Sequence, residues 1–344
     1  MKLTRLLLSL VALAALTGVA YVNQVTEGAA TKMSTAADKF VGTLTPDQKA
    51  LATFKFDDAE RLNWHFVPLE KEKKSTRKGL PFEAMNADQK AAALELIKAG
   101  TSAAGYTAAT NIMSLEGILL ELEKGSGPVR NTGWYFVSVF GTPSKTGPWG
   151  WRLEGHHLAL NFTMDKGQVV SATPAFFGAN PAVVKDGPRK GLESLPEAET
   201  PVRELFKALD ADQQKVVLQS KSLPEVAGKA TLPKVGEPLG LAGGKMNDKQ
   251  KALFQKVIDG YAQRVAPDIA AAQLAEVKEG GLDKAYFALS GSPEVGKAWT
   301  YRIQGPTYVI EFLNEQADGA KNPANHIHSA WRSLKNDFGL AVTK

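Results

Sequence analysis

The sequence of 344 residues predicts an α+β protein that is internally duplicated, with a central antiparallel sheet flanked by pairs of helices. Three observations lead to this prediction: an aromatic-rich segment recurs at a constant offset, two helix-starting phrases recur, and all pieces keep the same order. The two halves run from about 44 to 165 and from about 209 to 344, and we expect a pseudo-twofold relation between them. Because a two-stranded hairpin is not stable alone, one folded unit over 44–344 is favoured over two independent domains.

The strand-forming repeat has an offset of 150 residues, as from Trp149 to Trp299. The stretch 149–162 matches 299–312, with identical residues at four pairs of positions: Trp149/Trp299, Arg152/Arg302, Gly155/Gly305 and Phe162/Phe312. Aromatic and β-branched residues bounded by Gly and Pro are typical of strands. We therefore expect a strand at 135–140 that returns through 149–162, and a strand at 285–289 that returns through 299–312.

Helix starts are marked by residues that favour N-caps. Thr45 precedes Pro46, and Asn86 and Asn247 each precede apolar residues at helical spacing. The phrase that begins at Leu209 resembles the one that begins at Leu44 and contains Thr45. Each half is therefore expected to open with two helices.

The first twenty residues are typical of an export signal. Lys2 and Arg5 precede an uncharged apolar run over 6–20 that ends in small residues. The run is shorter than the roughly twenty residues that a spanning helix needs, so cleavage is favoured over an uncleaved N-terminal anchor. Residues 21–43, rich in Ala, Thr, Ser and Gly, are expected to be a linker. The predicted location is periplasmic or extracellular, with membrane contact only through the N-terminal segment.

The composition excludes several kinds of site. The chain has no cysteine, which excludes disulfides, thiolate zinc sites, iron–sulfur clusters and a cysteine nucleophile. It has no Gly-rich phosphate loop and no Gly-x-Ser-x-Gly elbow, which argues against a P-loop nucleotide enzyme and an ordinary α/β-hydrolase. Its one dense basic stretch is 71–74, so nucleic acid is not expected as a partner.

Four of the five histidines fall in two pairs, His156 with His157 and His326 with His328. On a strand, His326 and His328 would point to one face, while the adjacent His156 and His157 would point to opposite faces. The predicted site therefore contains His326, His328 and one of the other two. Three imidazoles suit zinc or copper, with hydrolytic or oxidative chemistry on a small substrate. The fifth histidine, His65, is expected to have a structural role.

Two glutamates near these strands are candidates for a catalytic base or for a group that orients a ligand, namely Glu154 and Glu311. The paired histidines are not duplicated with the fold: Gly155 is followed by His156-His157, and Gly305 by Pro306-Thr307. A purely structural role would be repeated with the structure. The asymmetry therefore favours a single functional site.

A metal-free binding protein is the main alternative. Arg152 and Arg302 lie on otherwise apolar strands, and each needs an anion, either a glutamate such as Glu116 or a small acidic ligand. Trp149 and Trp151 follow a turn-rich loop and would stack on a sugar-like ligand, although such aromatic residues are more often core. A structural envelope protein without a small-molecule site is a third interpretation.

Four blocks of the sequence together resemble a bacterial family catalogued as domain of unknown function 3500. The blocks are Arg61 to Pro68, Trp149 to Leu158, Phe176 to Pro181, and Tyr301 to Pro306 with Asn325 to Arg332. The resemblance covers nearly all of the chain after residue 43. It implies an exported, mostly bacterial protein and marks the four paired histidines. It names no reaction, so whether the protein is an enzyme stays open.

Overall fold

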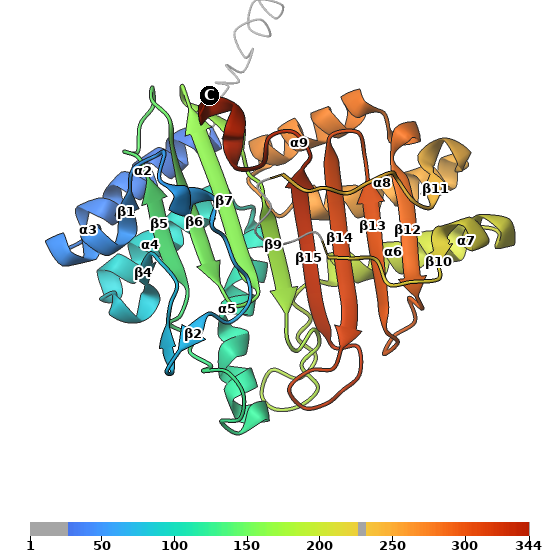
Figure 1. Ribbon diagram of the computed structural model, residues 1–344, viewed down its shortest axis with the longest axis horizontal. Coiled ribbons are helices and arrows are strands. Elements are labelled where there is room, and N and C mark those ends of the chain that lie inside the picture. The colour runs from blue at the N-terminus through green and yellow to red at the C-terminus, as the bar shows by residue number, and fades with distance from the viewer. Residues whose placement is uncertain (1–26, 226–231, 344) are drawn as a thin grey trace, which may run out of the picture.

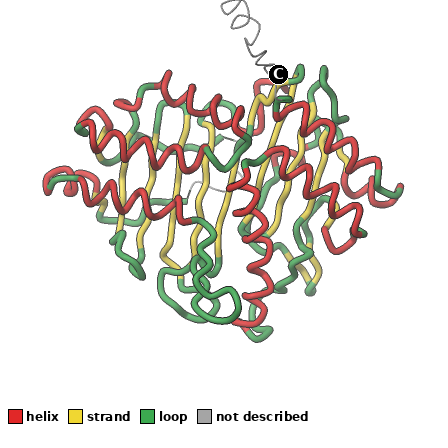
Figure 2. The backbone as a smooth tube through the Cα atoms, turned by 180° about the vertical axis from the view of Figure 1, so that it is seen from behind, coloured by secondary structure: helices red, strands yellow, loops and turns green. Residues whose placement is uncertain are grey.

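The computed structural model describes residues 27–225 and 232–343, which form a mixed α+β fold. One large sheet carries the helices on one face, as Figures 1 and 2 show from opposite sides. The predicted α+β class is therefore confirmed.

The first half of the described chain contributes four helices and the strands that run from one edge of the sheet to its middle. Its helices are α2 (Ala29–Gly42), α3 (Pro46–Ala52), α4 (Ala87–Gly100) and α5 (Ala103–Glu123). Its sheet strands are β1 (Thr53–Phe54), β4 (Leu80–Pro81), β5 (Phe136–Phe140), β6 (Trp149–Gly155), β7 (Leu158–Asp165), β8 (Gln168–Ser171) and β9 (Ala175–Ala179). A separate small hairpin is formed by β2 (Glu70–Lys71) and β3 (Lys74–Ser75).

The second half of the described chain contributes the strands from the middle of the sheet to its opposite edge. Its helices are α6 (Pro196–Ala208), α7 (Ala211–Val217), α8 (Asp248–Ala262) and α9 (Pro267–Gly280). Its strands are β10 (Leu218–Gln219), β11 (Leu241–Ala242), β12 (Tyr286–Gly291), β13 (Trp299–Gln304), β14 (Tyr308–Gln316) and β15 (His326–Ser333). A short 3-10 segment, Asp337–Thr343, ends the described chain.

The sheet has the order β1-β5-β6-β7-β9-β15-β14-β13-β12-β10, with β4, β8 and β11 paired beside β5, β7 and β12. It is antiparallel in its interior, as predicted, but parallel at both ends, where β1 pairs with β5 and β10 pairs with β12. Each short end strand is joined to its partner through helices, and such crossover connections produce parallel pairs.

The segments expected as single returning strands are each split by a turn. Residues 149–162 turn at His156-His157 into β6 and β7, and residues 299–312 turn at Pro306-Thr307 into β13 and β14. Each half therefore contains a three-stranded meander rather than a hairpin. Gly155 and Gly305-Pro306 mark these turns in the sequence, but the aromatic and β-branched residues on both sides of each turn favour one strand over the whole segment.

The predicted helix starts are confirmed as capping boxes. Thr45, Asn86, Asp210 and Asn247 each accept a hydrogen bond from the third helical residue, whose glutamine side chain bonds back to the cap. In the first half the amides of Gln48 and Gln89 bond reciprocally at 3.1 and 2.7 Å. In the second half Gln213 and Gln250 do so at the same two distances.

Residues 29–42 are helix α2 and not the expected linker. Met33, Ala37 and Phe40 are fully buried at helical spacing, and the helix packs against α4. An alanine-rich stretch is typical of both linkers and helices, and here burial of this apolar stripe decides in favour of the helix.

The N-terminal predictions fall outside the described structure. The predicted export signal at 1–20 and the start of the linker at 21–26 lie beyond the described residues. Among the described residues, no helix is long and apolar enough to cross a membrane.

Two layers of apolar packing flank the sheet. The larger core lies between the sheet and the helices and includes Trp149 and Trp151, whose exposed fractions are 0% and 1%. On the other face, loops cross the strands (Figure 1) and pack Trp64, Phe66 and Phe338 over Phe176. Buried polar side chains also lie within the sheet, such as Arg152 and Glu154 on β6.

We expect Phe40→Ala to lower the free energy of unfolding by about 3–5 kcal/mol, because it removes a fully buried aromatic ring. Urea denaturation is the measurement, and the control is Lys39→Ala on the exposed side of α2, which should change stability by less than about 0.5 kcal/mol. Equal stability of the two variants would show that α2 contributes no packing.

Candidate metal centre

His156 and His157 form the turn between β6 and β7. His157 has φ of 62°, in the left-handed region that non-glycine residues rarely adopt. Its amide donates to the Phe66 carbonyl at 2.8 Å, and its carbonyl accepts from the Gly178 amide at 2.7 Å. These two bonds fix the turn between the 62–68 loop and β9.

His326 and His328 lie at the start of β15, at the lower edge of the sheet in Figure 1. Their ring centroids are 4.9 Å apart, as expected for two side chains on one face of a strand. The His157 ring centroid lies 4.7 Å from that of His326 and 5.0 Å from that of His328. The structure therefore brings together three of the four predicted histidines.

The three rings point their nitrogens at one another. His157 Nε2 lies 2.8 Å from His326 Nε2 and 3.1 Å from His328 Nε2, and one ligand nitrogen from each residue lies within 4.8 Å of the others. A tetrahedral zinc with Zn–N distances of 2.0–2.1 Å separates its ligand nitrogens by about 3.3 Å. This buried triad could hold a metal ion.

Hydrogen bonds among the three neutral rings cannot satisfy all three Nε2 atoms at once. A neutral imidazole carries one N–H and one lone pair. If His157 Nε2 carries its proton, it donates to one neighbour only; if it does not, two donors compete for one lone pair. A cation would instead accept the lone pairs of all three nitrogens.

The Nδ1 atoms of His328 and His326, on the far side of each ring from Nε2, also contact polar side chains. His328 Nδ1 lies 2.9 Å from Glu225 Oε1, so an N–H on Nδ1 donates to the carboxylate and leaves Nε2 free as a ligand. His326 Nδ1 lies 3.4 Å from the Asn180 amide nitrogen, while Asn180 Oδ1 is buried without a partner among the described residues. Rotating this amide by 180° lets Oδ1 accept from His326 Nδ1–H and satisfies the orphaned oxygen.

The surroundings keep the imidazoles of His157 and His326 neutral. Burial lowers the pKa of His157 well below its usual value, and the neighbouring histidines lower it further. Burial, followed by the proximity of His328, lowers the pKa of His326 to about 3. A neutral imidazole is the form that binds metal.

His156 lies outside the triad. Its ring stacks on His157 with centroids 3.7 Å apart, and its Nδ1 pairs with the buried carboxylate of Glu116. Glu116 was a candidate partner for the strand arginines, but it is a partner of His156. Arg130 lies 3.1 Å from the same nitrogen and pairs with Glu123 at 2.8 Å.

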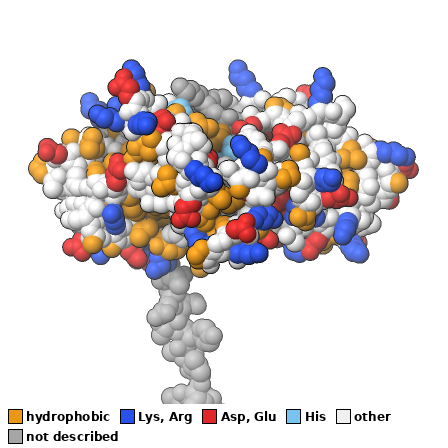
Figure 3. Space-filling view, turned by 90° about the horizontal axis from the view of Figure 1, so that it is seen from below, with side chains coloured by type: hydrophobic (Ala, Val, Ile, Leu, Met, Phe, Trp, Pro, Cys, Tyr) orange, Lys and Arg blue, Asp and Glu red, His pale blue; other side chains and the backbone are white. Residues whose placement is uncertain are grey.

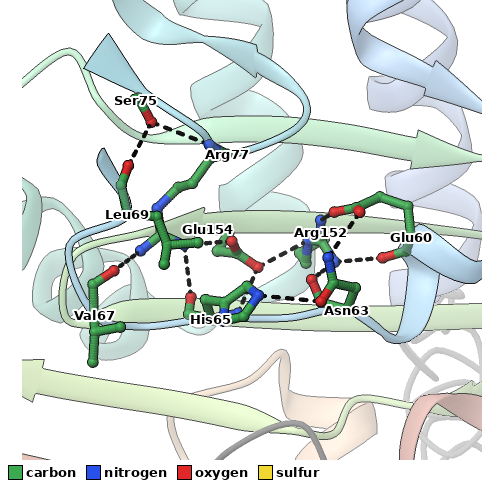
Figure 4. A network of polar contacts seen from close by, with 9 residues as sticks. All are labelled: Glu60, Asn63, His65, Val67, Leu69, Ser75, Arg77, Arg152 and Glu154. Atoms are coloured by element: carbon green, nitrogen blue, oxygen red, sulfur yellow. Dashed lines mark hydrogen bonds and ion pairs between the residues drawn. The ribbon is translucent and has the colours of Figure 1, made fainter. Parts of the chain in front are cut away.

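The predicted arginines and glutamates pair with one another or with internal partners. Figure 4 shows Glu154 between Arg77 and Arg152, with its carboxylate also accepting from the His65 amide at 2.9 Å. Arg152 further pairs with Glu60 at 2.6 Å. Arg152, which was predicted to bind a ligand, and Glu154, which was predicted to be a catalytic base or an orienting group, are therefore engaged in internal ion pairs.

In the second half, the predicted arginine and glutamate also form an internal ion pair. Arg302 pairs with Glu311 at 2.8 Å, and both residues are buried. Glu311 also lines a cavity of about 10 Å³ together with His328 and Glu225, which is about the space of one water molecule. The buried Trp149 and Trp151 present no surface for a ligand to stack on.

Sequence reasoning missed Asn180 and Glu225. Asn180 belongs to an Asn-Pro-Ala phrase that recurs at 322–324, which was a signal of a shared frame but not of contact with a histidine. Glu225 has no sequence signal, because it lies more than a hundred residues from His328 in the chain.

A surface hollow lies beside Asn180, the residue that contacts His326. A cavity of about 480 Å³ is lined by Asn180, the end of α5 with residues 122–127, and the loop 317–321. His326, bonded to Asn180, is half-buried rather than enclosed. Figure 3 views the molecule from this end, where histidine surface appears only in small patches. A small molecule therefore has room beside Asn180, although none of the three histidines lines the hollow itself.

Comparison with known proteins gives a family and no activity. A family model described as "Protein of unknown function (DUF3500)" matches residues 26–340. The chain matches no curated protein and no solved structure.

We expect the metal-free protein to lose stability as the pH falls below about 6.5, the usual pKa of histidine. Because the folded-state pKa of His326 is lowered to about 3, the unfolded chain binds more protons between these values. Each such histidine contributes a slope of up to about 1.4 kcal/mol per pH unit. Urea unfolding in EDTA from pH 7.5 to 4.5 measures the slope, which should be smaller in His326→Gln than in the wild-type protein. An unchanged slope in His326→Gln would contradict the burial argument.

Proposed function

Because the chain belongs to the DUF3500 family, whose description names no activity, its function must be inferred from the site, and we propose that it is a metal-dependent enzyme. Its centre would be zinc or copper bound by the Nε2 atoms of His157, His326 and His328. The observation that carries the proposal is the convergence of these three nitrogens, which protons satisfy poorly.

The chemistry of the donors supports these two metals. Neutral imidazole suits zinc and copper, and the chain has no thiolate to offer instead. Glu225 and the rotated amide of Asn180 would fix two rings with their Nε2 lone pairs inward, as the outer partners of metal-bound histidines do.

Three protein ligands leave one position open, which is typical of catalytic rather than structural zinc sites. A metal there would lower the pKa of a bound water and so favour hydrolysis; copper would instead favour oxidative chemistry. The cavity beside Asn180 gives a small substrate an approach. The arginine-paired glutamates Glu154 and Glu311 would hold the surrounding strands, with Glu311 also facing the small cavity under His328.

We also propose that the protein is exported to the periplasm or beyond. The support is the charged start and apolar run of residues 1–20, with cleavage favoured over anchoring. A site built only from nitrogen and oxygen ligands would tolerate an oxidising compartment, because it contains no thiol to oxidise.

We propose in addition that the two halves are copies of one unit. The strand order reads similarly from both ends, and each ends in a parallel pair. The reciprocal glutamine pairs, Gln48 with Gln89 and Gln213 with Gln250, repeat the same bond lengths. In this view the histidines were added to a duplicated frame at one place only.

Purified protein should bind about one equivalent of zinc or copper per chain. Replacing His157, His326 or His328 by Ala should reduce bound metal below about a tenth of an equivalent, because two imidazoles hold these ions far less tightly than three. Elemental analysis after dialysis is the measurement, with His65→Ala as the control that keeps its metal. Protein that stays metal-free after reconstitution, or triad variants that bind as well as wild type, would refute the centre.

The role of Asn180 is tested by a matched pair of variants. Asn180→Asp keeps an oxygen that accepts from His326 Nδ1–H and should retain metal affinity. Asn180→Leu has a similar shape and no acceptor, so metal affinity should fall about 10- to 100-fold. Competition with a chromophoric chelator measures both. If the two variants bind equally, Asn180 does not orient His326.

A further inference from the structure

Two of the three triad histidines are oriented by polar contacts at Nδ1, and His157 is not. Nδ1 of His328 faces Glu225, and Nδ1 of His326 faces the side-chain amide of Asn180. Among the described residues, the hydrogen bonds of the His157 ring are those of Nε2, within the triad itself. Metal-binding histidines are usually oriented through the nitrogen that does not bind the metal. Another contact must therefore fix the ring of His157.

We propose that His156 is a positioning residue for the metal ligand His157. Its ring lies against the His157 ring, with the centroids 3.7 Å apart and 29° between the ring planes. Because the two rings are stacked, turning His157 away from the triad would break this contact. The inference rests on the proposed metal centre. It gives the two adjacent histidines different tasks, since the first imidazole supports and the second binds.

The ring of His156 is itself held along its edge. Its Nδ1 pairs with the carboxylate of Glu116 on α5, and Arg130 Nη1 lies 3.1 Å from the same nitrogen. Because a carboxylate accepts and a guanidinium donates, Nδ1 has a partner in either tautomer. Arg130 is fixed in turn by Glu123, whose two carboxylate oxygens lie 2.8 Å from its Nε and Nη2. The support is therefore anchored on α5 and not on the other metal ligands.

The space around His156 leaves its ring little freedom to turn. The side chains of His156 and Glu116 are 10% and 6% exposed. The hydroxyl of Tyr135, which is fully buried, donates to the His156 carbonyl at 2.9 Å. A cavity of about 20 Å³ beside the ring has room for about one water molecule. His156 is therefore a firm support, with space for a ring slightly larger than imidazole.

The turn itself does not require a histidine at this position. The matching turn between β13 and β14 has Pro306 and Thr307 in place of His156 and His157. Both are short turns between neighbouring antiparallel strands. Because the second half forms its turn without a stacked pair of rings, the stack supports the histidine centre rather than the fold.

Zinc affinity and the visible spectrum of the cobalt-loaded, full-length protein test this role. His156→Ala removes the stack, so it should weaken zinc binding about 10-fold or more and change the cobalt spectrum. His156→Phe keeps a flat ring against His157 and should bind zinc within about threefold of the wild-type affinity, with the wild-type spectrum. Competition with a chromophoric chelator measures the affinities. The matched control is His65→Ala, which removes a histidine outside the centre and should change neither readout.

Urea unfolding in EDTA separates positioning from a merely structural role. A His156→Ala protein that unfolds more easily, yet keeps the wild-type zinc affinity and cobalt spectrum, would overturn the proposal. A His156→Phe protein that binds zinc no better than His156→Ala would also overturn it, because the stack would then not be the cause.

Crystal structures of the zinc-free proteins test the same role without a metal. In the wild type, His157 Nε2 should stay beside the Nε2 atoms of His326 and His328, at 2.8 and 3.1 Å. In His156→Ala the His157 ring should turn away from them. A ring that keeps its place in His156→Ala would overturn the positioning role, whereas wild-type protein that binds no zinc would refute the metal centre alone.

Discussion

The hydrogen bond from the Gly178 amide to the His157 carbonyl, at 2.7 Å, joins the parts of the protein on which the histidine centre depends. Gly178 lies on β9, which pairs with β7 on one side and places Gly178 opposite His328 of β15 on the other. A Cβ at residue 178 would lie 2.7 Å from the Ile327 carbonyl oxygen and 3.2 Å from the His157 ring. Glycine therefore permits the close approach that brings imidazoles from two distant segments to one point.

The charged groups around this junction are arranged to neutralise one another. Arg77 and Arg152 share Glu154, and Arg302 pairs with Glu311. Breaking such a buried pair would leave an uncompensated charge and would cost about 3–5 kcal/mol. These pairs fix the strands and the covering loops, and they leave the neutral imidazoles as the groups free to take up a cation. The ion pairs therefore stabilise the strands and loops, while the nitrogen lone pairs of the three histidines are the groups that would bind a metal.

Local rules predicted most of the frame. The caps at Asn86 and Asn247 and the one-face spacing of His326 and His328 depend only on neighbouring residues, and they were right. The choice of His157 over His156 depends on a left-handed turn that the 62–68 loop and strand β9 hold in place, which the sequence does not reveal. Asn180 and Glu225 meet their histidines only through the tertiary fold.

Anomalous diffraction from crystals of the zinc-loaded protein would show whether the three imidazoles bind a metal where β15 meets the β6–β7 turn. We expect one anomalous peak between His157, His326 and His328, with three nitrogen ligands at about 2.0–2.1 Å and one oxygen ligand from solvent. A peak elsewhere, or a zinc ion coordinated by oxygen atoms alone, would contradict it.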